Sequence, residues 1–462
     1  MPPFLLPERP LGSLDEYFAT EVGGLGLKRA VEVGPEATIA EVVRSGLRGR
    51  GGGGFPTGRK WEGVVAQGGT HRYVVANGAE GEPGTFKDRA LMRANPYQLV
   101  EGLVIAAFAI GAREAFLCLK ASFEPELEAV TRAVTELQDA GVCRDCQITI
   151  VRGPDEYLFG EEKAMLEVIE GNAPLPRLFP PYEHGLFATA PQTGWQASEN
   201  EPGHAGRHES NPTLVNNVET LSNVPHILAR GADWFRSMGT EASPGNVVCT
   251  VVGDVVAPDV GEVELGTPLR AVLDAVGSGV AAGRTVKAVF SGVANPVVPE
   301  PLLDVPLSYE GLDAVGSGMG AAGFIVYDDT ACMVEVARQF SRFLWVESCG
   351  QCPPCKLGSG EITERLERLQ AGTAEIDELS EIGAWLGKVT DGNRCFLAVE
   401  ERLAVGSILG AFPDEIVEHI EVGACPRPRP LPFPKLVDLG DGRVTYDESV
   451  WRKQPDWTYA TA

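Results

Sequence analysis

The chain has 462 residues, of which 44% are hydrophobic, and its formal net charge at pH 7 is −25. This length allows roughly two to four domains, each with a core of its own. The negative charge excludes nucleic acid as the main partner and argues against an anionic membrane surface, because both ligands require basic patches.

The expected compartment follows from the apolar segments. The longest apolar stretch, residues 99–119, is interrupted by Glu101, Arg113 and Glu114, so it falls short of the roughly 18 residues of a membrane span. The N-terminal sequence MPPFLLPERP lacks the basic and apolar regions of a secretion signal. We expect a cytoplasmic protein without direct membrane insertion, in which the ten cysteines are reduced and clustered thiols indicate metal.

The first half of the chain alternates between helical and strand patterns. Residues 1–45 look helical and lead into a glycine-rich loop. The elements that follow are a strand (72–77, RYVVAN), an acidic loop (78–89, GAEGEPGTFKDR), a helix running into a strand (95–120), an amphipathic helix (124–140) and a strand (146–153). Strands that alternate with helices predict an α/β domain with a largely parallel sheet.

The second half has a different texture. Residues 183–215 lack periodicity and are expected to form a long loop. Short β patterns around one helix follow, then a helical region that contains a cysteine-rich loop, and then a Pro-rich tail expected to be a strap or disordered. The predicted domains are residues 1–240, 244–330 and 331–425, with 426–462 as the tail.

A cysteine motif lies in the stretch ESCGQCPPCKLGSG. Cys349, Cys352 and Cys355 have the spacing C-x2-C-x2-C, which can cover one face of a cubane cluster and leaves the fourth iron for a remote thiolate. Cys395, in GNRCFLAVEERL, is the favoured fourth ligand over Cys425. Zinc is the main alternative, but structural zinc sites usually take two ligands from each of two pairs, so the three-plus-one pattern favours iron–sulfur.

The remaining cysteines carry weaker signals. Cys118, Cys249 and Cys332 stand in apolar runs, where a small buried hydrophobe is the simplest interpretation. Cys143 and Cys146 form a lone C-x2-C without a matching pair nearby, so a second metal site there is disfavoured.

The glycine-rich loop, GLRGRGGGGFPTGRKW, contains G-x-G-x-x-G at Gly49, Gly51 and Gly54. No strand pattern precedes it and Phe55-Pro56 follows it, so an ordinary dinucleotide-binding turn is disfavoured. Successive glycines still expose backbone N–H groups to a phosphate or a flat ring. A flexible connector is the alternative, which the surrounding cations disfavour; these are Arg48, Arg50, Arg59 and Lys60.

Two acidic pairs stand near expected element ends. Glu80 and Glu82 lie between glycines and a proline, and Glu161 and Glu162 lie where a helix is expected to begin. These carboxylates could hydrogen-bond ribityl or ribose hydroxyls, or they could simply cap a turn and a helix.

Both candidate sites imply redox chemistry of complementary kinds. A nicotinamide donates a hydride, which carries two electrons, whereas a cubane cluster accepts one electron at a time. A flavin is the usual carrier between the two. A phosphate-cradling loop together with a cubane motif therefore predicts a flavin beside a cluster.

Five motifs carry a family resemblance: GLRGRGGGGFPTGRKW, NGAEGEPGTFKDR, FGEEKAMLEVIEG, NPTLVNNVETL and ESCGQCPPCKLG. In this order they resemble the NADH-binding flavoprotein subunit of respiratory complex I, which recurs in NAD-reducing hydrogenases and NAD-dependent formate dehydrogenases. The resemblance covers about residues 40–420. It implies an α/β chain with a Rossmann-like FMN domain, a small ubiquitin-like (SLBB) domain and a C-terminal helical bundle that holds a [4Fe-4S] cluster.

The resemblance also implies site residues. Those expected around FMN are Gly49, Arg50, Gly51, Gly52, Gly53, Gly54, Lys60, Asn77, Glu80, Gly160, Glu161, Glu162, Asn216 and Asn217. Phe55, Glu82 and the aromatic Tyr182 would lie on the NADH side, and Glu82 and Glu162 would bias ligand binding and reduction potential. The cluster ligands would be Cys349, Cys352, Cys355 and Cys395.

Several positions depart from the family pattern. Residues 190–211 look like an insertion, whose His204 and His208 are expected to be solvated. The other departures are Ala79 for an aspartate, Lys163 for a threonine, Phe179 for a lysine and Phe396 for a proline. They bear on nucleotide choice and flavin affinity more than on the cluster.

The expected function is electron transfer from NADH through FMN to the [4Fe-4S] cluster and on to a partner. By resemblance the partner is a ferredoxin- or thioredoxin-like [2Fe-2S] subunit or another redox protein, within a complex that could hold the chain at the inner face of the membrane. One alternative is a cluster-bearing electron-transfer or scaffold subunit that has lost nucleotide turnover. Another is a zinc-stabilised binding module.

Overall fold

The structure, a computed structural model, describes residues 3–68, 71–189 and 209–460, and the chain divides into two compact units. Unit 1 comprises residues 1–80 and 88–248, and unit 2 comprises residues 81–87 and 249–462. The predicted α/β class with a parallel sheet is confirmed by unit 1.

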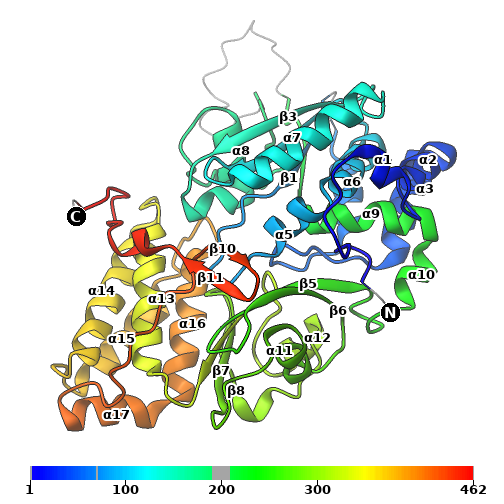
Figure 1. Cartoon of the computed structure of the whole chain (residues 1–462). Helices are drawn as coiled ribbons and strands as arrows, with labels where there is room; N and C mark the ends of the chain where they lie inside the picture. Colours follow the sequence, from blue (N-terminus) through cyan, green and yellow to red (C-terminus); the bar gives the residue numbers. More distant parts are fainter. Residues whose placement is uncertain (1–2, 69–70, 190–208, 461–462) are drawn as a thin grey trace, which may run out of the picture. The chain divides into compact units, whose positions relative to one another are not determined.

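Unit 1 is built on a four-stranded parallel sheet with the order β3-β2-β1-β4 (Figure 1). Its strands are β1 (Tyr73–Asn77), β2 (Glu114–Lys120), β3 (Gln147–Gly153) and β4 (Thr213–Asn217). The chain proceeds outward from β1 through β2 to β3 and then returns to the other edge of β1. The strand order therefore reverses between β1 and β4, and ligands of open α/β sheets bind at the carboxyl ends of the strands at such a point.

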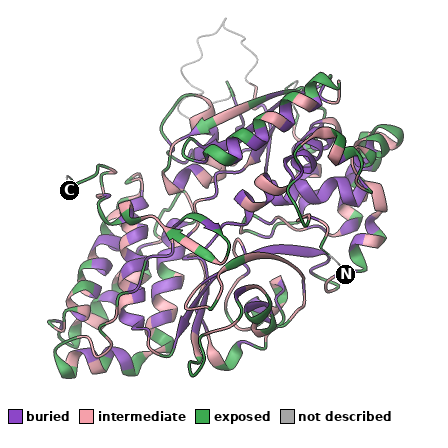
Figure 2. Ribbon diagram, viewed as in Figure 1, coloured by how far each residue is buried: buried purple, intermediate pink, exposed green. Residues whose placement is uncertain are grey.

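Helices cover both faces of this sheet, because alternate residues of each strand point to opposite sides. Val74 and Ala76 belong to a large core that includes residues of α6 (Pro96–Ile110), α7 (Glu124–Asp139) and α9 (Val218–Arg230). Tyr73 and Val75 belong to a smaller core with residues of α8 (Glu162–Ile169). Figure 2 shows buried residues concentrated where these layers meet.

The apolar stretch 99–119 forms most of α6 and β2. Nearly every residue of α6 is buried, which is what an all-round apolar helix requires in water. Within the described ranges no helix is long and apolar enough to cross a membrane.

The remaining helices of unit 1 are anchored partly by a buried acid. Glu101 of α6 accepts hydrogen bonds from the Tyr17 hydroxyl (2.5 Å) and from the backbone N–H groups of Gly24 (2.9 Å) and Leu27 (2.8 Å). The helices concerned and their neighbours are α1 (Leu14–Phe18), α2 (Leu25–Val33), α3 (Pro35–Ser45), α4 (Thr57–Ala66), α5 (Lys87–Ala94) and α10 (Ala232–Arg236), with a 3-10 turn η1 (Tyr157–Gly160).

Unit 2 contains a mixed five-stranded sheet with the order β6-β5-β9-β7-β8. Its elements are β5 (Asn246–Gly253), β6 (Asp259–Glu264), α11 (Leu269–Gly277), β7 (Val286–Ser291), β8 (Val298–Pro299), α12 (Tyr309–Ala314) and β9 (Gly323–Asp328), with a 3-10 turn η3 (Glu300–Leu302). Residues 81–87 join this unit, since the N–H of Phe86 donates to the Thr250 hydroxyl (2.9 Å) and that of Gly84 to the Pro434 carbonyl (2.7 Å).

A helical bundle completes unit 2, with α13 (Met333–Glu347), α14 (Pro353–Gln370), α15 (Asp377–Lys388), α16 (Leu397–Ala411) and α17 (Pro413–Val422). Polar contacts tie three of these helices together in the interior. The Ser341 hydroxyl on α13 donates to Glu401 on α16 (2.6 Å) and lies 2.8 Å from the Thr363 hydroxyl on α14.

The C-terminal tail is ordered, so the expectation of disorder was wrong. It forms a hairpin of β10 (Leu436–Gly440) and β11 (Arg443–Tyr446), followed by η4 (Glu448–Trp451). The Lys453 ammonium contacts both carboxylate oxygens of Glu347 at 2.9 Å, and both side chains are buried. A buried ion pair far along the chain is what the Pro-rich composition could not reveal.

Candidate functional site

Two asparagines mark the switch point of the unit 1 sheet. Asn77 and Asn217 are paired in the register of β1 and β4, at the carboxyl ends of both strands. The Asn77 amide donates to the Gly160 carbonyl (2.8 Å) and so links β1 to the turn that follows β3. Asn217 caps α9 by accepting from the N–H of Glu219 (2.9 Å), and its amide donates to Asp88 (2.7 Å).

The glycine-rich loop lies against this point. Hydrogen bonds from Gly49 N to Phe55 O (2.9 Å) and from Thr57 N to Leu47 O (2.8 Å) close the loop at its base. A Cβ on Gly51 would lie 2.9 Å from the Cβ of Asn217, so this residue has to be glycine for the loop to reach β4.

The next two glycines face open space. A Cβ on Gly52 or Gly53 would meet no described atom within 4 Å, and Gly52 has a φ of +124°. Backbone that is uncovered on one side, with N–H groups and no side chains, can approach a phosphate or a flat ring closely. We refer to Gly51, Gly52 and Gly53 with Asn77 and Asn217 as the cradle.

The cations of the loop are used differently from what their number indicated. Arg50 is buried, its guanidinium donates to the carbonyls of Pro244 (3.2 Å) and Asn246 (3.0 Å), and its N–H donates to the Thr220 hydroxyl (2.8 Å). Arg50 therefore anchors the loop to the interior of unit 1. Two other arginines are also engaged: Arg48 with the Gly54 carbonyl and the exposed Arg59 with Glu62.

Lys60 is the cation of this region that pairs with a predicted site acid. Its ammonium forms an ion pair with Glu162, the first residue of α8. Glu161 caps the same helix, since its carboxylate accepts from the N–H groups of Lys163 (2.9 Å) and Ala164 (3.0 Å). Burial raises the pKa of Glu161 to about 7, against the opposing effect of the Lys163 ammonium 3.9 Å away.

Glu80 is a buried structural acid as well as a predicted site residue. It accepts from Asp88 N (3.1 Å) and from Arg89 Nε (3.0 Å), so it holds the first turn of α5. The neighbouring Ala79 is packed in the smaller core, where an aspartate would have to be solvated or paired. Asn216 accepts from the indole N–H of Trp61 (2.9 Å), which fixes the amide next to the cradle.

The residues expected on the nucleotide side are less concentrated. Phe55 and Tyr182 are exposed aromatics of unit 1. Glu82 belongs to unit 2, where its carboxylate accepts from the N–H of Val293 (2.6 Å). His204 and His208 lie outside the described residues.

The residues of unit 1 fit FMN. The cradle offers uncovered backbone, its asparagine side chains are oriented by protein partners, and Lys60 places a cation beside Glu162. A phosphate or electron-rich ring would use the first and last of these features, and polyol hydroxyls would use the amides and carboxylates.

Three motif cysteines of unit 2 cluster at the beginning of α14. Cys352 is the N-cap residue of this helix, and Cys355 is buried in its first turn, 3.3 Å from the Ser348 hydroxyl. The helix N-terminus favours negative charge. Lys356 adds a cation, whose ammonium donates to the carbonyls of Trp345 (2.8 Å) and Ser348 (2.7 Å) and whose pKa burial lowers to about 8.

The start of α16 lies close to these thiols. Burial raises the pKa of Cys355 to about 11, with smaller contributions from Cys352, Cys349 and Glu401. Glu401 stands on α16 six residues after Cys395, whose backbone carbonyl accepts from the Asn393 amide (2.7 Å). The structure thus brings the segment that carries the predicted fourth ligand to the same end of the bundle.

The motif cysteines are spaced for more than one metal ion. In the described parts of the chain, one group of Cys, His, Asp and Glu residues has three donor atoms within 4.8 Å of one another, and none of the four motif cysteines belongs to it. A single zinc ion needs donors that close, whereas a cubane spreads its four thiolates over different irons. The separation favours [4Fe-4S] over zinc.

Sequence reasoning missed the partners that position the predicted residues. Trp61 and Asp88 orient asparagines, Arg89 pairs with Glu80, and Glu401 is a buried acid beside the cysteines. The only signal for Glu401 was an acid within the apolar helix pattern LAVEERLAV.

Comparisons with known proteins agree with both sites. Residues 42–226 match the Nuo51 FMN-binding domain, and residues 335–419 match the iron–sulfur binding region of NADH-ubiquinone oxidoreductase-F. An F-type polypeptide of the NADH-quinone oxidoreductase of Rhizobium meliloti is 37% identical over 427 residues, which cover 90% of this chain and 97% of the relative. The HndC component of the NADP-reducing hydrogenase of Solidesulfovibrio fructosivorans is 33% identical over 92% of this chain and 83% of its own length.

A solved structure shares the fold. An NAD+-reducing [NiFe]-hydrogenase in the H2-reduced state matches with a TM-score of 0.76 and 30% sequence identity. The match covers 91% of this chain and 68% of the hydrogenase chain.

Proposed function

This chain belongs to the family of NADH-quinone oxidoreductase F subunits, and on that premise we propose that it couples oxidation of a nicotinamide nucleotide to reduction of a partner redox protein. The family, the FMN-binding domain and the iron–sulfur region expected from the sequence motifs are confirmed. When bound, FMN supplies the exchange between a two-electron donor and one-electron acceptors, and the [4Fe-4S] cluster accepts single electrons.

In unit 1 the cradle would hold FMN, and its residues would act by binding and orientation. The backbone of Gly52 and Gly53 would contact the phosphate or the ring, and Asn77, Asn216 and Asn217 would hydrogen-bond the remainder. Glu80 would act through α5, whose first turn it holds in place.

The polar groups at the edge of the cradle would set its charge. Lys60 and Glu162 form an ion pair in which the acid is partly exposed, so Glu162 remains accessible to a ligand. A fixed cation here favours a more electron-rich bound group, since an opposite charge stabilises added negative charge. Glu82 and the exposed aromatics Phe55 and Tyr182 are proposed for the nucleotide side, where the rings offer stacking surfaces.

In unit 2 the proposed cluster ligands are Cys349, Cys352, Cys355 and Cys395. Lys356 and the N-terminus of α14 would offset the charge of four thiolates. The mixed sheet with a helix between its second and third strands supports the expected ubiquitin-like domain over about residues 244–330.

The proposed partner is a subunit with a [2Fe-2S] centre or another redox protein within a larger complex, in the cytoplasm. The net charge of −25 suits a partner with a basic docking face.

The observation that carries this proposal is the uncovered backbone at the switch point, and one substitution tests it. Gly53→Ala adds a methyl group that meets no protein atom, so a loss of flavin affinity would come from the ligand. We expect FMN binding to weaken at least about tenfold, which corresponds to about 1.4 kcal/mol. FMN fluorescence quenching measures the affinity, and NADH-dependent bleaching measures turnover.

Gly63→Ala is the matched control, because Gly63 in α4 also has open space around it but lies outside the loop. Equal FMN affinities in the two variants would overturn the assignment of the cradle. Brown protein that retains the cluster but never binds flavin would instead favour a subunit that has lost nucleotide turnover.

A further inference from the structure

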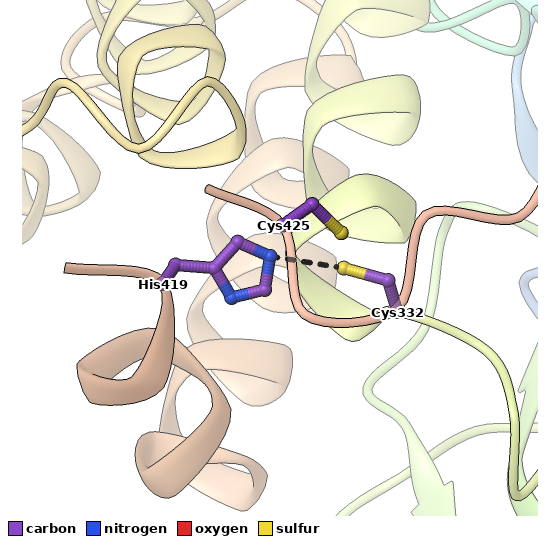
Figure 3. A group of neighbouring side chains, drawn as sticks. All are labelled: Cys332, His419 and Cys425. Atoms are coloured by element: carbon purple, nitrogen blue, oxygen red, sulfur yellow. Dashed lines mark hydrogen bonds between the residues drawn. The ribbon is translucent and has the colours of Figure 1, made fainter. Parts of the chain in front are cut away.

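A second group of metal-ligand side chains lies in unit 2, outside the cysteine motif. It consists of Cys332, His419 and Cys425, whose donor atoms all lie within 4.8 Å of one another (Figure 3). Cys332 and His419 are buried and Cys425 is partly exposed. Neither the cradle nor the proposed cluster uses these residues.

Three separate segments bring the group together. Cys332 is the N-cap residue of α13, His419 lies in the last turn of α17, and Cys425 follows the left-handed cap of that helix at Gly423. The loop with Cys425 packs tightly on the loop after α14, since a Cβ on Gly372 would lie 2.1 Å from the backbone of Gly423. Close backbone packing holds the third ligand in place.

The histidine is oriented as a ligand. Its Nδ1 lies 2.6 Å from the Glu415 carbonyl, which can only accept, so Nδ1 carries the proton of the neutral ring. Nε2 then presents its lone pair, and it faces the Cys332 sulfur at 3.3 Å. Histidines bound to metal usually donate their other ring N–H to a carbonyl or carboxylate in this way.

The spacing suits a tetrahedral ion. With Zn–S of about 2.3 Å and Zn–N of about 2.0 Å, two ligand atoms of a tetrahedron lie roughly 3.5–3.8 Å apart. The measured Nε2 to Sγ distance of 3.3 Å is close to that value, and the limit of 4.8 Å for the group leaves room for small adjustments.

The surroundings supply the other needs of such a site. The Cys332 sulfur accepts from the N–H of Glu335 (3.4 Å) in the first turn of α13, which favours a thiolate. Gln370 Oε1 lies 3.5 Å from the same sulfur and is a neutral oxygen within reach of the fourth position. Two thiolates neutralise a divalent ion, so the buried site would carry no net charge.

We propose that Cys332, His419 and Cys425 bind one Zn2+ ion, with water or the Gln370 carbonyl as the fourth ligand. The ion would be structural. It would join the first turn of the bundle to its last helix, positions that are 87 residues apart in the sequence. Closing so long a loop is the arrangement in which a metal stabilises a fold most.

The first test is the metal content and coordination of the full chain, purified anaerobically with its iron and flavin. We expect about one zinc per chain in addition to the cluster iron, with X-ray absorption at the zinc edge showing two sulfurs and one histidine nitrogen at tetrahedral distances. A four-sulfur environment, or no zinc together with a Cys332–Cys425 disulfide, would overturn the proposal. This measurement needs no variant.

The second test separates this site from the cysteine motif. Cys425→Ser should remove the zinc and keep the iron, because Cys425 is partly exposed and not a proposed cluster ligand. Cys249→Ser, which alters another cysteine of unit 2, should keep both metals. Zinc that persists in Cys425→Ser but disappears in Cys349→Ser would assign the ion to the cluster ligands and contradict the proposal.

Discussion

The two redox sites differ in what holds them together. The flavin site of unit 1 is built from protein groups that bind one another, such as Asn77 with Gly160 and Glu80 with Arg89. The cluster site of unit 2 gathers thiols, and burial raises the pKa of Cys355 to about 11 and also raises that of Cys349. The first site is thus preformed for its ligand, whereas the second needs bound metal before its cysteines become thiolates.

This difference implies that loss of FMN should leave unit 1 folded, whereas loss of the cluster should weaken the end of the bundle in unit 2. The family departures follow the same division, since Ala79 and Lys163 lie in unit 1 and the four cysteines are intact. A preformed polar network tolerates such changes because the remaining contacts still hold the backbone.

The largest expected effect comes from Cys395→Ser. Removal of the remote ligand should reduce cluster iron from about four per chain to near zero, because the fourth iron loses its thiolate. FMN content should remain unchanged, since the flavin ligands belong to the other unit. Iron analysis and electron paramagnetic resonance of the dithionite-reduced protein measure the cluster, with Cys249→Ser as the control. Full iron in the variant would exclude Cys395 as a ligand.

The next effect concerns the network of unit 1. Glu80→Ala should lower the free energy of unfolding by about 3 kcal/mol, because it leaves the buried Arg89 guanidinium without its partner. Glu62→Ala removes an exposed ion pair with Arg59 and should cost less than about 1 kcal/mol. Chemical denaturation of FMN-free protein compares them. Similar costs for both would show that the site is not preformed by buried pairs.

The two units should also respond to pH in opposite directions. In unit 1, burial lowers the pKa of His226 to about 3, below its unfolded value. The unfolded chain therefore binds the proton first, and stability is lost as pH falls below about 6.5. The loss at pH 5 should be on the order of 2 kcal/mol, and it should disappear in His226→Gln.

In unit 2, burial raises the pKa of Glu401 to about 8, above its unfolded value. Here the folded chain keeps the proton, so stability is greatest at low pH and falls as pH rises from about 4.5 towards 8. Between pH 5 and pH 7 the loss should be on the order of 2 kcal/mol, and Glu401→Gln should abolish it. Denaturation of both variants across pH measures the slopes, and slopes of the same sign would contradict the assignment of either group.

The smallest effect is expected from Lys163→Thr, which restores the usual family residue. The ammonium lowers the pKa of Glu161, so its removal should raise that pKa above about 7. Because the pair is long, at 3.9 Å, the change in FMN affinity at pH 7 should stay below about 1 kcal/mol. FMN titrations from pH 6 to pH 8 test this, and a loss of flavin binding would mean that Lys163 contacts the ligand directly.

The sequence predicted the chemistry of both sites better than the tasks of individual side chains. Motif spacing was enough to choose the cluster cysteines and the glycine loop, because both depend on residues close together in the chain. The inward turn of Arg50 and the burial of Glu80 depend on residues far away, which no local pattern contains.

The group of Cys332, His419 and Cys425 illustrates the same limit. In the sequence Cys332 resembled a buried hydrophobe and Cys425 a weak candidate for the cluster, because the three ligands come from distant segments. Only folding of α13 against α17 brings the donors within 4.8 Å.

Anaerobic titration of the flavin-loaded protein with NADH tests the central claim most directly. The account predicts bleaching of the flavin band near about 450 nm together with reduction of the cluster in the native chain, and bleaching alone in Cys395→Ser. Absence of bleaching with both NADH and NADPH, in protein that contains FMN and the cluster, would contradict it.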